Sequence, residues 1–252
     1  MLRPCLAAVA ALAAAPLPAQ SVDEIIAKNV AARGGMQKIK AVESVRMTGR
    51  MSLMQGLEVP VVLEMKRPNR MRMDIVVQGM TGSQAFDGKG GWQLMPFGGR
   101  KDAEPLGPEE TKDAEEQADM DGPLVDYKAK GHTVELVGKE AVEGSDAYKL
   151  KVTLKNGDVR YFFLDAEHFL EIRGEGKRHV RGTETETESS IGDYKEVGGL
   201  MLPHAFEMGP KGSPQKQKLT VEKIELNVPI DDARFTMPAR TEAPKESPQA
   251  KD

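Results

Sequence analysis

The sequence is almost without cysteine. Its single thiol, Cys5, lies in an N-terminal stretch that we expect to be removed from the mature protein. A mature chain without cysteine cannot form disulfides, use a cysteine nucleophile or hold zinc through cysteine. The fold must therefore be stabilised by an ordinary hydrophobic core, and a chain of 252 residues is long enough to build one.

The chain also has no large excess of one charge and no long apolar run. Its formal net charge is −4, which gives it no general attraction for nucleic acid. After the N-terminus, no apolar stretch approaches the 18 residues that a transmembrane helix needs. We therefore predict a protein with no nucleic-acid partner and no membrane-spanning helix.

The two ends of the chain differ in composition from its middle. Arg3 precedes an apolar run from Cys5 to Leu17, and small residues and prolines lead to Ala19, which is the layout of a secretory signal peptide. The alternative is a packed N-terminal helix. The last residues are rich in proline and charge, which indicates a disordered tail. We predict a signal peptide at 1–19, one domain at 20–238, a tail at 239–252 and a periplasmic location.

The mature chain begins with a helix signal and continues with strands. Ser21 and Glu24 have the spacing of a capping box, and Gly34 with Gly35 would end the helix. Apolar residues then alternate with polar ones in 59–65 and 71–77, and Pro68-Asn69 between them indicates a turn.

The same alternation recurs along the rest of the chain. It is found in 147–154, where Asn156-Gly157 signals a following hairpin, and in several segments up to residue 227. Strands of 8–10 residues joined by short turns favour an antiparallel meander with one face in water.

One acidic segment interrupts the strands. Residues 102–121 contain nine acids and one base, Lys112, and Pro108 has the position of a helix start. The apolar residues available to this helix are Ala114, Ala118 and Met120. One interpretation is a solvated surface helix or mobile loop, and the other is a lid over a cavity.

The glycine-rich stretch FDGKGGW, ending at Trp92, resembles a phosphate-binding loop only superficially. Gly88-Lys89 is followed by Gly90 instead of Ser or Thr, and no helix follows whose N-terminus could face a phosphate. We interpret it as a tight connection between strands, with a buried indole N–H on Trp92 that needs a partner.

No set of residues indicates catalysis. Glu184, Glu186 and Glu188 would point to one side of a strand, where a solvated outer face is favoured over a hydrolase pair or a cation site. The four histidines lack metal-ligand spacing, and the serines lack a nucleophile elbow. We predict no enzyme activity, no metal and no cofactor.

The methionines are more informative than the glutamates, histidines and serines. Seven of the 14 lie in the first strands: Met47, Met51, Met54, Met65, Met71, Met73 and Met80. Methionine adapts to irregular apolar partners, so these residues either fill the core or accept flexible chains. Basic residues gather at one hairpin end, where they form a solvated turn or meet anionic headgroups or an acidic partner. They are Lys66, Arg67, Arg70 and Arg72.

Taken in order, these features resemble a family. A signal peptide precedes a capped helix with ARGG, then KRPNRMRM, FDGKGGWQLMP, DGPLVDY, GKEAVEGSDAYKLKV, GGLMLPHAFE and IDDARFTMP. This order over residues 22–238 resembles the LolA/LolB-like outer-membrane lipoprotein-sorting proteins. The resemblance implies an α+β, mainly antiparallel fold, in which a curved, incomplete β-barrel wraps around helices and an apolar cavity.

The resemblance also implies a function. It suggests a periplasmic carrier of lipid or lipoprotein acyl chains, with sorting partners at the inner and outer membranes, and we expect a monomer. An envelope sensor or protein-binding module on the same fold is the alternative. A basic residue would hold a lid, with Arg46, Arg50 and Arg72 as candidates. The expected cavity residues are Val61, Leu63, Met65, Met71, Met73, Ile75 and Trp92.

Overall fold

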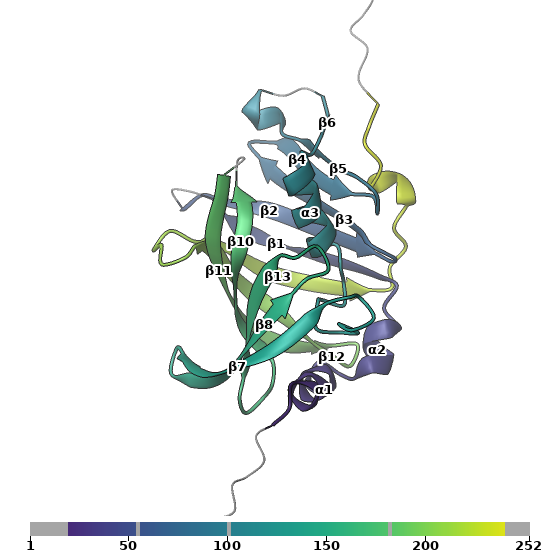
Figure 1. Ribbon diagram of the computed structural model, residues 1–252. Helices are drawn as coiled ribbons and strands as arrows, with labels where there is room; N and C mark the ends of the chain where they lie inside the picture. The colour runs from purple at the N-terminus through teal and green to yellow at the C-terminus, as the bar shows by residue number, and fades with distance from the viewer. Residues whose placement is uncertain (1–19, 54–55, 100–101, 181–182, 240–252) are drawn as a thin grey trace, which may run out of the picture.

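A single antiparallel sheet dominates the computed structural model, which describes residues 20–53, 56–99, 102–180 and 183–239. The strands follow the order β6-β5-β4-β3-β2-β1-β13-β12-β11-β10-β9-β8-β7. Within the described ranges β6 and β7 do not pair, so the curved sheet stays open (Figure 1). The predicted mainly antiparallel half-barrel is confirmed. The predicted signal peptide and residues 240–252 of the predicted tail lie outside the described residues.

The strands differ in length from two to fifteen residues. They are β1 (Ser44–Ser52), β2 (Glu58–Lys66), β3 (Arg70–Val77), β4 (Met80–Phe86), β5 (Gly91–Leu94), β6 (Glu104–Pro105), β7 (Thr133–Val142), β8 (Ser145–Thr153), β9 (Val159–Asp165), β10 (Glu171–Val180), β11 (Thr183–Val197), β12 (Leu200–Pro210) and β13 (Gln217–Leu226).

The helices are few and short. They are α1 (Val22–Ala32), α2 (Met36–Lys40) and α3 (Pro108–Gln117), with 3-10 turns η2 (Pro96–Gly98) and η3 (Asp232–Arg234). None of the helices in the described part of the chain is long and apolar enough to cross a bilayer.

Helix α1 begins as predicted. The Ser21 side chain accepts from the Glu24 backbone N–H and the Glu24 carboxylate accepts from the Ser21 N–H, which completes the capping box. Ile25, Ile26 and Val30 are buried on one face of the helix. They join the main core with inward residues of β1, β8, β12 and β13. We call the face of the sheet that carries α1 and α3 the inner face.

The predicted hairpins are present. In β2 and β3, Leu63 pairs with Met73 and Met65 with Met71, so these side chains share the inner face. The Asn156-Gly157 signal also marks a hairpin, between β8 and β9. Its loop is longer than the two residues that this signal favours, because Thr153 pairs with Val159.

Helix α3 lies across the inner face of the curved sheet (Figure 1). It contacts β3, β4 and β5 on one wall and β10 on the other. Ala114 and Ala118 are fully buried. The interpretation of this acidic segment as a solvated surface helix is therefore wrong, because one side of the helix packs on the sheet. The two alanines are small enough to let the helix approach the sheet closely.

Candidate functional site

An apolar patch lies on the inner face between α3 and strands β2–β4. Met71 and Phe86 are buried there against Ala114 and Ala118 of α3. Partly buried apolar side chains complete it, and we call the sheet side of this cluster the methionine patch. It consists of Leu63, Met65, Met71, Met73, Phe86 and Leu106.

Six of the seven expected cavity residues lie on this inner face. Four of them belong to the methionine patch, and the pairing of Val61 with Ile75 places the remaining two on the same face, one step along the strands. Val61 is buried and Ile75 is half-buried. Helix α3 covers the methionine patch. A lid over a cavity was one of the two interpretations of its sequence, but the strands beneath it were not predicted.

Trp92 departs from the expectation, because it lies on the opposite, outer face of the sheet. Trp92 pairs with Ala85, and Ala85 pairs with Arg72, so these three side chains share one face of the sheet. Met71 and Phe86 pair with each other and point to the opposite face. The Arg72 guanidinium lies 5.4 Å from the centre of the indole ring. Trp92 therefore cannot line a cavity with Met71 and Met73.

The Trp92 indole has the hydrogen-bond partner that its burial requires. Its Nε1–H donates to the Phe235 carbonyl oxygen at 2.7 Å, and Phe235 is itself fully buried. The preceding loop is a tight turn, in which Asp87 Oδ1 accepts from the backbone N–H groups of Lys89 and Gly90 at 2.8 and 2.9 Å. The prediction of a strand connection is confirmed.

We expect Trp92→Phe to lower the free energy of unfolding by about 1–2 kcal/mol. The ring would still pack, but the buried Phe235 carbonyl would lose its donor. Urea denaturation measures the change, and Trp92→Ala should cost more because it also empties the ring's volume. A Phe variant as stable as the wild type would contradict this role for the indole N–H.

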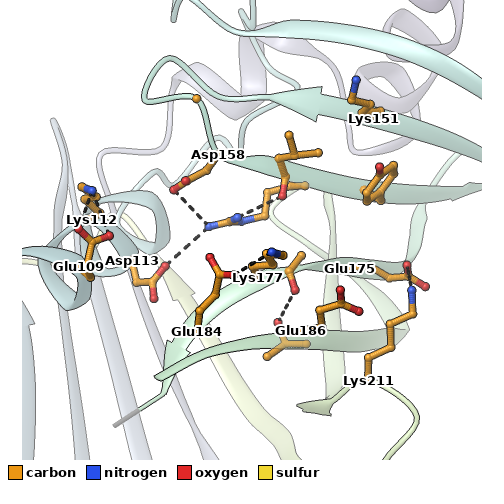
Figure 2. Close-up of a pocket in the computed structure, with 16 residues that line it drawn as sticks. Glu109, Lys112, Asp113, Lys151, Asp158, Glu175, Lys177, Glu184, Glu186 and Lys211 are labelled. Carbon is orange, nitrogen blue, oxygen red and sulfur yellow. Dashed lines mark hydrogen bonds and ion pairs between the residues drawn. The ribbon is translucent and has the colours of Figure 1, made fainter. Parts of the chain in front are cut away.

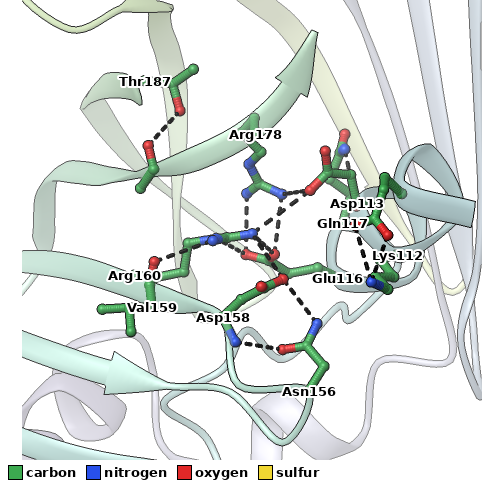
Figure 3. Close-up of polar contacts among 12 residues, drawn as sticks. Lys112, Asp113, Glu116, Gln117, Asn156, Asp158, Val159, Arg160, Arg178 and Thr187 are labelled. Carbon is green, nitrogen blue, oxygen red and sulfur yellow. Dashed lines mark hydrogen bonds and ion pairs between the residues drawn. The ribbon is translucent and has the colours of Figure 1, made fainter. Parts of the chain in front are cut away.

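Two arginines on the far wall hold α3 in place. Arg160 of β9 donates to both carboxylate oxygens of Glu116, at 3.1 and 2.8 Å. Arg178 of β10 donates to the same two oxygens, both at 3.1 Å, and to Asp113 at 3.3 Å (Figure 3). Arg160 is only 5% exposed, so this is a nearly buried charge cluster. We call these four residues the α3 anchor.

The arginines proposed from the resemblance do not hold α3. They lie on the outer face or its rim, where Arg46 pairs with Glu64 at 2.9 Å, Arg50 with Glu58 at 3.3 Å and Arg72 with Asp74 at 2.8 Å. The arginines that pair with the helix come from β9 and β10, 44 and 62 positions after Glu116. No local sequence signal links them to the acidic segment.

A second ionic contact fixes the chain after α3. Asp121 is 4% exposed and accepts from Arg67 at 2.6 and 3.2 Å and from Lys40 at 2.6 Å. Its backbone oxygen accepts from Arg33 at 2.9 Å. Burial acts to raise the pKa of Asp121, but the hydrogen bonds from Arg67 and Lys40 outweigh it and lower this pKa to about 2.

The basic residues around the β2–β3 turn all have acidic partners. Lys66 and Arg70 both contact Asp232 at 2.6 Å, while Arg67 contacts Asp121 and Arg72 contacts Asp74. The turn is partly exposed, and each of its cations is also paired with a carboxylate of the same chain. These cations tie two distant segments of the chain to the hairpin.

A charged hollow of about 490 Å³ lies beside α3, at the ends of β9–β11 (Figure 2). Its lysines pair with neighbouring carboxylates, as Lys177 does with Glu184 and Lys211 with Glu175, each at 2.7 Å. Glu184 and Glu186 are exposed, which confirms the expected solvated face for these two residues. Glu188 is more covered, because Arg173 and Lys216 pair with it.

Two further cavities lie on the inner face, separated by the chain that follows α3. A cavity of about 360 Å³ lies between residues 116–123 and strands β9–β12. A smaller one of about 80 Å³ lies on the other side of Met120 and Asp121, and Val45, Met47, Met65 and Leu202 line it.

An open antiparallel half-barrel with helices on its inner face is the class of fold that these features define. No family model matches the sequence, and no curated protein matches it. Solved structures do match the fold. A LolA superfamily protein from Nitrosomonas europaea is 15% identical, with a TM-score of 0.57, and the match covers 86% of this chain and 98% of that one.

Two other structures give similar results. An outer membrane lipoprotein-sorting protein domain from Vibrio parahaemolyticus is 13% identical over 84% of this chain and 94% of its own, with a TM-score of 0.54. A DUF1329 family protein from Desulfovibrio piger is 13% identical over 85% and 97%, with a TM-score of 0.54. The chain therefore has the LolA-like fold that the sequence resemblance implies.

Proposed function

We propose that this protein binds the acyl chains of a lipid or lipoprotein on its inner face, beneath α3, and carries them through the periplasm. The observation that supports this most directly is the cover of the methionine patch. Helix α3 meets the patch through two buried alanines, and its other contacts to the sheet are largely ionic.

The contact between α3 and the methionine patch is small enough for a ligand to replace it. An alanine buries little apolar area, whereas each methylene of an acyl chain contributes about 0.8 kcal/mol when buried. Methionine side chains can rearrange around a flexible chain. A ligand that takes the place of Ala114 and Ala118 against the patch would thus replace a small apolar contact with a larger one.

The main test is the binding of a fluorescent fatty-acyl probe to the protein lacking residues 1–19. We expect wild-type protein to bind it, and Met65→Asp with Met73→Asp to weaken binding at least tenfold. Both carboxylates would enter the apolar patch, where an unpaired charge is strongly disfavoured.

The matched control places the same charges on the other face of the same strands. Val62→Asp with Val76→Asp should leave probe affinity within about twofold, because these valines point away from the patch. Circular dichroism establishes that each variant is folded. The proposal fails if wild-type protein neither binds the probe nor co-purifies with lipid in native mass spectrometry.

A further inference from the structure

The cavity of about 360 Å³ has one wall that is unusual for a strand. Its lining includes apolar side chains from three strands of the inner face, Phe162, Ile191 and Met208, together with Ser189. Between them lies β10, which contributes Gly174 and Gly176 to the lining. We call this space the glycine groove.

The two glycines make room for neighbouring side chains. A β-carbon on Gly174 would lie 2.8 Å from Ser189 Oγ, and one on Gly176 would lie 2.6 Å from Arg160 Cδ. Glycine within a strand costs stability and often marks a place where a ligand approaches the backbone. Here the close neighbours are the Ser189 hydroxyl and the stem of Arg160, and Gly174 also leaves room for the Glu171 carboxylate, whose Oε1 would lie 3.5 Å from a β-carbon there.

Glu171, at the start of β10, is the carboxylate of the groove that lacks a cation. Within the described residues, the other four acids of the lining each have an ion-pair partner: Glu116, Asp119, Glu175 and Glu188. No cationic nitrogen in the described ranges is placed within ion-pairing distance of the Glu171 carboxylate.

Two other groups act on Glu171 from neighbouring elements. Arg33, at the end of α1, exerts a weaker attraction on this carboxylate while its guanidinium donates to the Asp121 carbonyl. Tyr194 of β11 donates its hydroxyl to the Glu171 backbone oxygen at 2.8 Å. Burial raises the pKa of Glu171 to about 7, and Arg33 only partly offsets it. An unpaired carboxylate in a cavity is stabilised most by a cation that the ligand supplies.

We propose that the glycine groove binds an amphiphile with a primary-amine head group, with the ammonium against Glu171 and the chain along the apolar side chains of Phe162, Ile191 and Met208. This inference rests on the proposed acyl binding and adds the chemical class of the head group. Arg160 and Arg178, at the far end of the groove, do not compete with the amine for Glu171, because both are paired with Glu116 of α3.

The test compares three probes with the same twelve-carbon chain: dodecylamine, dodecanol and dodecanoate. Their affinities are measured by displacement of the fluorescent acyl probe at pH 8, below their micelle concentrations. We expect wild-type protein to bind dodecylamine at least tenfold more tightly than dodecanol. Glu171→Gln should remove this preference, so that dodecylamine and dodecanol bind with similar affinity. Glu186→Gln, an exposed acid on the other face, should keep the preference.

A second readout needs no variant. Dodecylamine affinity of the wild-type protein should rise from pH 6 to pH 8, as Glu171 loses its proton while the amine keeps its own, and dodecanol affinity should not. Equal affinity for dodecylamine and dodecanol, or a preference that survives Glu171→Gln, would overturn the head-group assignment while leaving acyl binding intact. If none of the three displaces a fluorescent probe that does bind, the head-group assignment fails alone. If the fluorescent probe itself does not bind and no lipid co-purifies, the proposed function fails as well.

Discussion

Replacing Glu116 by alanine should lower the free energy of unfolding by about 3–5 kcal/mol. Its carboxylate neutralises Arg160 and Arg178 together, and the Arg160 side chain is only 6% exposed. Without Glu116, a nearly buried guanidinium would keep a hydrogen bond to the Val159 carbonyl oxygen and the more distant carboxylates of Asp113 and Asp158, at 3.7 and 3.8 Å. Urea denaturation measures the loss.

The same substitution should loosen α3 before the whole protein unfolds. The helix would keep the contacts of Ala114 and Ala118 with the methionine patch but lose its strongest link to β9 and β10. We expect Glu116→Ala to speed amide hydrogen exchange in residues 108–118 relative to wild type. Exchange in β8, which belongs to the main core, should change less.

Glu115→Ala is the control for this experiment. Glu115 is exposed on the same helix, one position away, so its loss should change stability by no more than about 0.5 kcal/mol. If Glu116→Ala and Glu115→Ala have equal effects on stability and on exchange in α3, the arginines do not anchor the helix.

The two ionic contacts of this region give α3 and the chain after it a defined position. The α3 anchor joins the helix to β9 and β10, and Asp121 joins the following segment to α2 and the β2–β3 turn. Both contacts lie beside the cavities of the inner face. A ligand bound in either cavity would therefore contact residues 116–123, the segment that these ion pairs hold.

The main features of the fold could be predicted because they are local. Alternation of apolar and polar residues fixes which side of a strand is buried, and Ser21 with Glu24 marks the start of α1 within four residues. The inward positions of Met65 and Met71 follow from the same alternation once their two strands pair.

The position of α3 could not be predicted in this way. Its sequence is dominated by acids, and its stability in this place depends on Arg160 and Arg178, which lie 44 and 62 residues from Glu116. The face of Trp92 was equally undetermined, because it depends on the number of residues in the loop after β4. That loop pairs Ala85 with Trp92 and so turns the indole outward.

Asp121→Ala should be the second strongly destabilising substitution, with an expected loss of about 3 kcal/mol in the free energy of unfolding. Asp121 is almost fully buried, and its removal would leave Arg67 without its main carboxylate partner. We place the loss at the lower end of the range for buried pairs, because Lys40 is 38% exposed and water can replace its partner. Asp126→Ala is the control, since Asp126 also pairs with Lys40 but is 43% exposed, and it should cost less than 1 kcal/mol.

The pH dependence of this contribution follows from the low pKa of Asp121. The carboxyl group has a pKa of about 2 in the folded protein and about 3.9 when unfolded, so the unfolded state binds the proton more readily between these values. The stabilisation is therefore fully present above about pH 4 and is lost as the pH falls towards 2. Stability curves of wild type and Asp121→Asn should converge over that interval, whereas parallel curves from pH 5 to pH 2 would show that Asp121 does not ionise against Arg67 and Lys40.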